Sequence, residues 1–199
     1  TVQTWRELNG IPCIDTSEKA QKQSICTSRS FGEMVGDFDT LKTSVADFAA
    51  SCANKLRGQH SVASAVTVFI LSNRFREDLP QYCNGTTITL ETPTSDTIEI
   101  TAAATKALRA IYREGILYKK AGVILGDITD ASYLQRNLFD ALRNRPERNL
   151  LMEGIDRLNH HDGLKTIRLA AEGGAKPLWR PKSEHKSGNY LSDLSDILT

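Results

Sequence analysis

The chain has 199 residues, of which 40% are hydrophobic and 25% charged, and its formal net charge is +1. This balance is typical of a globular protein with a sizeable core, in one large or two small domains. It excludes a strongly basic or acidic protein, so any nucleic-acid binding must come from a local patch of cations. Residues 1–130 carry 14 Lys and Arg against 15 Asp and Glu, a net charge of −1. For the cations of this region, ordinary solvated surface charge is therefore as good an interpretation as nucleic-acid binding.

The cysteines and histidines give no metal-binding pattern. The cysteines stand at positions 13, 26, 52 and 83, with no CxxC pair, and the four histidines form no HExxH motif. This spacing indicates free thiols in a reducing compartment rather than a zinc site. No apolar run is long enough to span a membrane, and there is no secretory signal, so we expect a cytoplasmic protein.

The first 130 residues alternate between strand and helix signals. Residues 1–20 are mixed and polar and are interpreted as a connector. Two segments have the apolar period of a helix, one from Asp37 to Arg57 and one that starts with a capping-box pattern at Asp96 and Glu99. Strand-like alternation or β-branched enrichment marks four segments, the third of which is expected to stop at Pro93. These strands are predicted at 21–31, 62–71, 86–91 and 119–125.

The order strand, helix, strand, strand, helix, strand predicts an α+β fold. Two helices can cover only one face of a four-stranded sheet, which leaves the other face to solvent or to a ligand. A mostly helical or irregular C-terminal segment follows. In it, Pro146 starts a helix of about four turns by spacing, with Leu151, Ile155 and Leu158 on one face. Residues 166–170 are a candidate short strand, and the tail from Gly173 is interpreted as weakly structured or partner-dependent.

No catalytic set is visible. The chain has neither a GxxxxGK[ST] phosphate loop nor a GxGxxG motif. Ser28 and Ser30 lack a histidine placed by sequence to act as a base. Asp37, Asp96 and Glu99 are better explained as helix caps than as metal ligands. We therefore predict no catalytic residue and no metal site in this chain.

Cations and small hydroxyl residues lie on or beside the four strands. Both kinds of side chain contact phosphate oxygens, so a polar sheet face fringed by cations can lie along a duplex backbone. The candidate DNA-binding residues are Lys22, Ser28, Arg29, Ser30, Thr67, Arg74, Thr87, Thr89, Lys119 and Lys120. A sheet face that binds a partner protein, without direct DNA contact, is the alternative.

A second binding signal is the run from Gln135 to Phe139. Leu138 and Phe139 can fill an apolar pocket on a partner while the Gln135 amide hydrogen-bonds at its rim. The alternative is that the two apolar residues pack on their own domain, because such short motifs also occur by chance.

Four segments of the chain resemble the UmuC-type family of Y-family, translesion DNA polymerases. The run Ile25–Glu33 is similar to that family's "ICSRSFGE" stretch, and three further segments agree in order and spacing: Arg6–Cys13, Leu90–Asp96 and Tyr118–Asp127. Asn137–Asp140 falls where the family carries its clamp-binding peptide. The C-terminal segment, with Trp179 and the run Tyr190–Leu194, is similar in a less specific way.

The resemblance implies a domain organisation. Residues 1–20 would be the thumb tail and linker, 21–130 the little finger, whose open face holds primer–template DNA, and 131–145 a linker with the clamp-binding peptide. Residues 146–199 would be a C-terminal region that meets accessory SOS proteins of the UmuD and RecA kind. The palm, with its Mg²⁺ site, would precede Thr1, so this chain is expected to need no cofactor and not to polymerise by itself. Its role would be to grip DNA and the sliding clamp in DNA repair.

One position departs from the family's pattern. The clamp peptide usually reads Gln-Leu-x-Leu-Phe, and here Arg136 replaces the first leucine. Loss of one buried leucine contact costs about 1–2 kcal/mol, or about tenfold in affinity. We therefore expect clamp binding through Gln135, Leu138 and Phe139 to persist in a weaker form.

Overall fold

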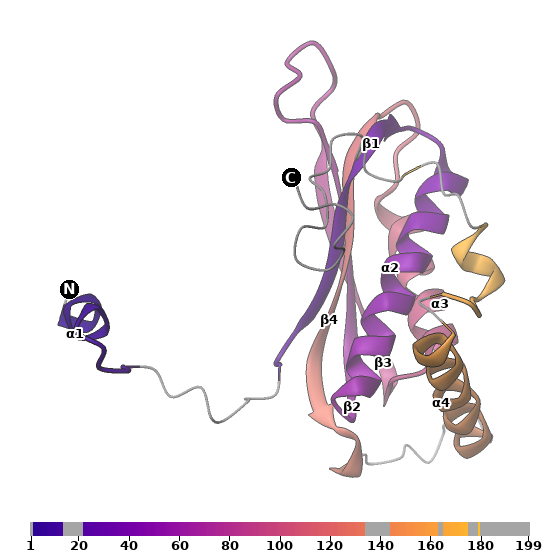
Figure 1. The fold of residues 1–199 in the computed structure, drawn as a ribbon. Helices are drawn as coiled ribbons and strands as arrows, with labels where there is room; N and C mark the ends of the chain where they lie inside the picture. The colour runs from indigo at the N-terminus through magenta and orange to yellow at the C-terminus, as the bar shows by residue number, and fades with distance from the viewer. Residues whose placement is uncertain (1, 14–21, 134–143, 163–164, 175–178, 180–199) are drawn as a thin grey trace, which may run out of the picture.

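The computed structural model describes residues 2–13, 22–133, 144–162, 165–174 and 179 (Figure 1). Its centre is one antiparallel sheet in the spatial order β1-β4-β2-β3. The last strand in the sequence, β4, lies between β1 and β2 and pairs with both. The strands are β1 (Ile25–Val35), β2 (Ser61–Ser72), β3 (Cys83–Thr94) and β4 (Tyr118–Asp130).

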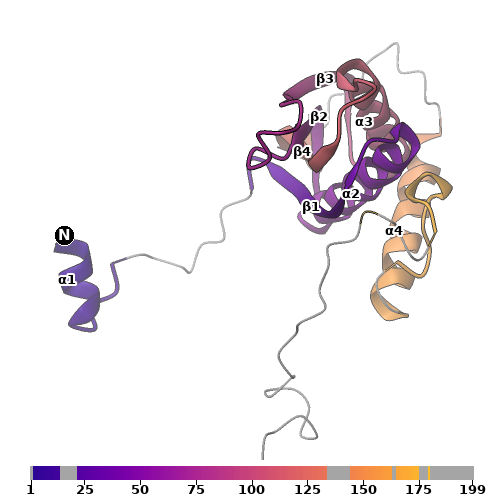
Figure 2. The ribbon, with the colours of Figure 1, turned by 90° about the horizontal axis from the view of Figure 1, so that it is seen from above.

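Two helices, α2 (Phe38–Gly58) and α3 (Thr97–Ile111), cover one face of the sheet, as Figures 1 and 2 show from two directions. The Asp37 carboxylate accepts a hydrogen bond from the Thr40 amide at 2.8 Å, and that of Asp96 accepts one from the Ile98 amide at 2.7 Å. Each helix therefore starts at an aspartate that satisfies a free backbone donor. The predicted α+β fold, with both helices on the same face, is confirmed.

The core lies between the sheet and the two helices. Val66, Val68 and Ile70 of β2 are buried there with Val123 and Leu125 of β4. From α2 and α3, the largest buried side chains are Leu41, Phe48, Leu56, Ile100 and Leu108. Because side chains alternate along a strand, this assignment fixes the opposite parity as the open face.

Two local expectations are wrong. Strand β3 does not stop at Pro93 but continues to Thr94, with a shift of register between its pairs at Thr89 and Thr94. An edge strand tolerates this because the missing proline N–H costs no ladder bond there. The capping box also fails, since the Glu99 carboxylate bonds the Thr94 hydroxyl at 2.5 Å and Arg145 at 2.9 Å instead of the Asp96 amide.

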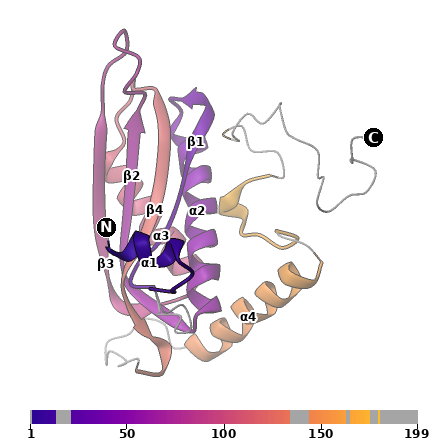
Figure 3. The same ribbon diagram turned by 60° about the vertical axis from the view of Figure 1, so that its left-hand side comes forward.

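The predicted C-terminal helix is α4 (Arg145–His161), and it is held mainly by charge (Figure 3). Arg57 of α2 binds the Asp156 carboxylate through two nitrogens, at 2.6 and 2.8 Å, and Arg148 binds Asp96 at 2.5 Å. Met152 is buried, whereas Leu151 is 54% exposed. Of the three residues that gave the helical spacing, Leu151 and Leu158 are exposed and Ile155 is half-buried.

The remaining described segments are short. The strand expected at 166–170 does not form, and a 3-10 turn, η2 (Ala170–Glu172), lies beside α2 instead. Another 3-10 turn, η1 (Ala131–Tyr133), follows β4. The predicted connector contains α1 (Val2–Leu8), a helix with no buried residue. No helix among the described residues is long and apolar enough to cross a membrane.

Candidate nucleic-acid interface

The open face of the sheet consists of rows of residues that run across neighbouring strands. Residues paired in register share a face, so the rows follow from the pairing of β1, β4, β2 and β3. From one end to the other they are Ser30–Lys120–Leu71–Cys83, Ser28–Gly122–Phe69–Gly85, Cys26–Ile124–Thr67–Thr87 and Gly126–Ala65–Thr89. None of the residues in these four rows is acidic. We call this set the open face.

The open face brings together all five hydroxyl residues predicted from the sequence. Ser28 and Ser30 stand on β1, and Thr87 and Thr89 are exposed on β3. Thr67, half-buried on β2, shares a hydrogen bond of 2.7 Å with the Thr87 hydroxyl. Small hydroxyl side chains on a sheet surface donate to phosphate oxygens without reading bases. The arrangement therefore suits a ligand whose phosphates run along the sheet.

Apolar side chains also lie on the open face. The sequence-based prediction of a polar sheet face did not include them. Phe69 and Ile124 are half-buried there. The Phe69 ring lies across Gly122, where an added Cβ would come within 2.3 Å of the ring Cζ and 2.6 Å of the Ser28 Cβ. Gly122 thus lets the ring lie flat on the sheet. A flat ring keeps the surface low enough for a large partner to approach.

Of the two neighbouring lysines, only Lys120 belongs to the open face. Lys119 sits where the register of β4 shifts against both of its neighbours. Its ammonium donates to the Phe31 carbonyl at 2.5 Å and to the Gly32 carbonyl at 3.4 Å. The expectation that Lys119 fringes the open face is therefore corrected, because the irregularity turns it toward the backbone of β1.

Arg29 is also placed away from the open face. It pairs with Ala121, a core residue, and so points to the helix-covered side of β1. There it lines a cavity of about 300 Å³ between α2, α4 and the segment 165–172, together with Lys55 and Asp156. Strand parity accounts for the difference, because Arg29 lies between Ser28 and Ser30.

The two remaining predicted cations flank the sheet at opposite ends. Lys22 is exposed just before β1, near the third row, which contains Cys26. Arg74 is exposed in the turn between β2 and β3, beyond the row of Lys120. Both can reach along a ligand that is longer than the sheet. The predicted clamp-binding residues Gln135, Leu138 and Phe139 lie outside the described residues.

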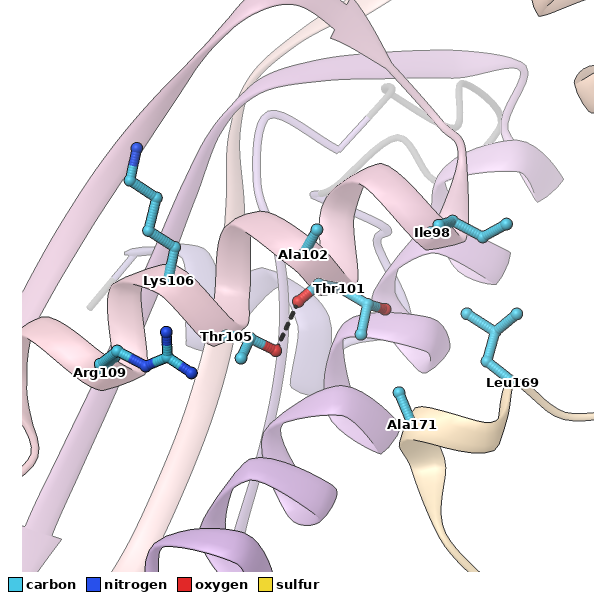
Figure 4. A pocket seen from close by; sticks show the side chains of 8 residues that line it. All are labelled: Ile98, Thr101, Ala102, Thr105, Lys106, Arg109, Leu169 and Ala171. Carbon is cyan, nitrogen blue, oxygen red and sulfur yellow. Dashed lines mark hydrogen bonds between the residues drawn. The ribbon is translucent and has the colours of Figure 1, made fainter.

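Further hollows among the described residues include some on the helix side. One of about 550 Å³ runs along α3 between Ile98 and Arg109 and is closed by Leu169 and Ala171 (Figure 4). Its lining is mostly small and apolar, with the Thr105 hydroxyl bonded to the Thr101 carbonyl at 2.9 Å. Within the described part of the chain, no three Cys, His, Asp or Glu side chains gather as a cation site.

Sequence reasoning missed two thiols on the open face. Cys26 and Cys83 are both exposed, and they stand in the third and first rows. Cys52, in contrast, is buried on the helix side, and burial raises the pKa of its thiol although a hydrogen bond to Thr27 opposes the shift. Strand parity is the signal that could have found Cys26, since its neighbour Ile25 is buried in the core.

Known families and proteins match this chain over most of its length. Residues 22–138 match the model described as the impB/mucB/samB family C-terminal domain, and residues 149–199 match a domain of unknown function (DUF4113). Protein UmuC of Salmonella typhimurium is 41% identical over 196 residues, which cover 98% of this chain and 46% of that protein. Protein ImpB of Salmonella typhimurium is 40% identical over 195 residues, with the same shares of 98% and 46%.

A third relative, protein MucB of Escherichia coli, is 36% identical over 171 residues, or 85% of this chain and 40% of that protein. The chain therefore spans about half the length of the curated relatives it matches. A solved structure, an insertion ternary complex of Dbh DNA polymerase, is 13% identical with a TM-score of 0.45 over 54% of this chain and 29% of that one. The family model covers more than half of the sequence, so this chain belongs to the impB/mucB/samB family, the UmuC-type family that its motifs resemble, and carries that family's C-terminal domain.

Proposed function

We propose that the chain is the DNA-binding and clamp-binding C-terminal part of an error-prone, lesion-bypass DNA polymerase. The observation that carries the proposal is the open face. Among the described residues, helices cover one side of the sheet only, and the other side holds Lys120 and five hydroxyl residues with no acid in its four rows. A surface rich in hydroxyl groups, with no acid in these four rows, fits a long polyanion better than a small substrate.

The proposed mechanism is a grip that does not read sequence. Ser28, Thr87 and Thr89 donate hydrogen bonds to backbone phosphates, and Lys120 adds a charge-assisted contact. Lys22 and Arg74 extend the contact beyond the two ends of the sheet. Because no contact requires a particular base, the grip holds on damaged template as well as on normal DNA.

The proposed parent protein has further activities, of which only the catalytic one would lie outside this chain. Its palm would hold Mg²⁺ and the nucleotide, and the whole protein would act in DNA repair and the SOS response in the cytoplasm. Gln135, Leu138 and Phe139 would bind the sliding clamp, and the region after 145 would meet partners of the UmuD and RecA kind. The support for these assignments is the relationship to protein UmuC and protein ImpB.

A salt titration of duplex binding tests the proposal. Fluorescence anisotropy would follow the full chain on two duplexes of equal length and unrelated sequence. We expect equal affinities for both, with log K falling linearly against log salt by about 0.9 for each phosphate that a lysine or arginine neutralises. A strong preference for one sequence, or the absence of duplex binding at low salt, would contradict the proposed grip.

A second candidate function is supported by Phe69, Leu71 and Ile124. These apolar side chains are half-buried on the open face and suit a protein partner. A plain protein-interaction module would bind that partner with little dependence on salt, because burial of apolar area is not screened. The same titration therefore separates the two functions.

A further inference from the structure

The loop between β2 and β3 holds a fixed shape through its own hydrogen bonds. The Gln81 amide nitrogen donates to the Arg76, Asn73 and Leu79 carbonyls at 2.8, 3.1 and 3.2 Å. Arg76 and Asp78 form a bidentate ion pair at 2.7 and 2.6 Å. A loop tied at this many points keeps its tip in place when a ligand arrives, so little conformational entropy is lost on binding.

The tip of this loop presents an aromatic ring to solvent. Phe75 is 95% exposed, and its amide donates to the Asn73 side chain at 3.1 Å. Arg74, beside it in the chain, is exposed too. Figures 1 and 2 show the loop projecting past the end of the sheet and leaning to the side away from α2 and α3, which is the side of the open face. The tip thus extends the open face beyond Lys120.

An exposed ring next to an exposed cation has the chemistry of a single-strand contact. Base–aromatic stacking together with a cation that neutralises phosphate binds single-stranded nucleic acid without sequence preference. Inside a duplex the base faces are already covered by their neighbours. A ring at the edge of a duplex-binding surface can therefore stack only on a terminal or unpaired base.

We propose that Phe75 stacks on an unpaired nucleotide where the duplex on the open face passes into single-stranded DNA. The inference rests on the proposed function, because the duplex must first lie on the sheet. Arg74 holds the phosphate next to that nucleotide. Phenylalanine carries no hydrogen-bonding group, so the contact recognises strandedness and not base identity.

The test compares two DNA probes on the full chain. One is a blunt duplex, and the other is the same duplex with a short 5′ overhang whose first unpaired base is 2-aminopurine. We expect the wild type to bind the overhang probe about tenfold more tightly than the blunt probe and to quench the 2-aminopurine by stacking. In Phe75→Ala the preference and the quenching disappear, while affinity for the blunt duplex is retained. Phe75→Trp keeps both.

Three results would overturn the inference. They are equal affinities of the wild type for both probes, a Phe75→Ala variant that keeps the overhang preference, and unquenched 2-aminopurine in the wild-type complex. A protein partner on Phe75 would give the second result. Failure of the proposed function is distinguishable, because the blunt duplex would then not bind at all. The melting temperature serves as a control and should not change, because the ring has almost no contacts to lose.

Discussion

Replacement of Lys120 by glutamine tests the open face at its only cation. Lys120 stands between Ser30 and Leu71 in the first row, and no other Lys or Arg occurs in the four rows. Glutamine keeps most of the side chain and removes the charge. If the lysine contacts one phosphate, the variant loses one contact and the release of one counterion.

The size of the effect follows from the counterion rule. Removing one contact lowers the slope of log K against log salt by about 0.9. The loss of affinity is the ratio of the wild-type to the variant binding constant. Between about 50 mM and about 200 mM salt, a fourfold change, this ratio should therefore shrink about threefold. Fluorescence anisotropy with one labelled duplex at several salt concentrations measures both the slope and the loss of affinity.

Lys119 provides the matched control, since it is adjacent in sequence and its ammonium is bound to the Phe31 and Gly32 carbonyls. Lys119→Met should keep the wild-type salt slope. It should instead lower the free energy of unfolding by about 1–3 kcal/mol, the usual cost of losing a charge-assisted bond. If Lys120→Gln leaves the slope unchanged, or if Lys119→Met changes it as much, the assignment of the DNA-facing side is wrong.

Three further changes probe other parts of the molecule. Leu138→Ala with Phe139→Ala should abolish binding to the sliding clamp and leave the melting temperature unchanged. Gly122→Ala should destabilise the fold by about 1–3 kcal/mol in urea unfolding, because its Cβ would overlap Phe69. Burial raises the pKa of Glu172 in the folded state, so folding favours the protonated carboxyl. The free energy of unfolding should therefore fall as the pH rises above 4.5, the ordinary pKa of a glutamate. Glu172→Gln should reduce that fall in thermal melts across this pH range.

Each of these changes has its own check. A large loss of thermal stability in the Leu138 and Phe139 variant would indicate that the two residues pack inside their own domain. Gly126→Ala is the control for Gly122, since its Cβ would lie 3.7 Å from that of Ala65 and should cost little. If Gly122→Ala and Gly126→Ala have the same free energy of unfolding, close packing of Phe69 does not explain why position 122 is a glycine. A Glu172→Gln profile parallel to that of the wild type would contradict the stated role of burial.

The order and faces of the central elements were predictable because they depend on periodicity. Val66, Val68 and Ile70 alternate with Thr67 and Phe69, and this parity alone identifies the buried side of β2. Asp37 and Asp96 mark the helix starts because a side chain that caps a helix acts within a few residues in sequence. Local patterns of this kind need no knowledge of tertiary packing.

The orientation of single charged residues was less predictable. The side of the sheet on which Arg29 lies could have been derived from strand parity. Arg29 was instead grouped with the open-face residues because of its charge, and it lies on the helix side. Lys119 could not be placed from the sequence, because a register shift has no strong local signal. Glu99 was assigned to a capping box, yet its partners Thr94 and Arg145 lie on other elements, and Arg145 is far away in sequence. Contacts between distant segments decide such cases.

The most direct test of the open face uses the thiols that the chain already has. Cys26 and Cys83 are exposed on the open face, Cys13 is exposed elsewhere, and Cys52 is buried with a raised pKa. Maleimide labelling followed by peptide mass spectrometry reports the rate at each thiol, with and without duplex DNA. We predict that DNA slows labelling of Cys26 and Cys83, leaves Cys13 unaffected, and finds Cys52 unreactive throughout. Equal labelling rates of Cys26 and Cys83 with and without saturating DNA would contradict the central claim that the duplex lies on this side of the sheet.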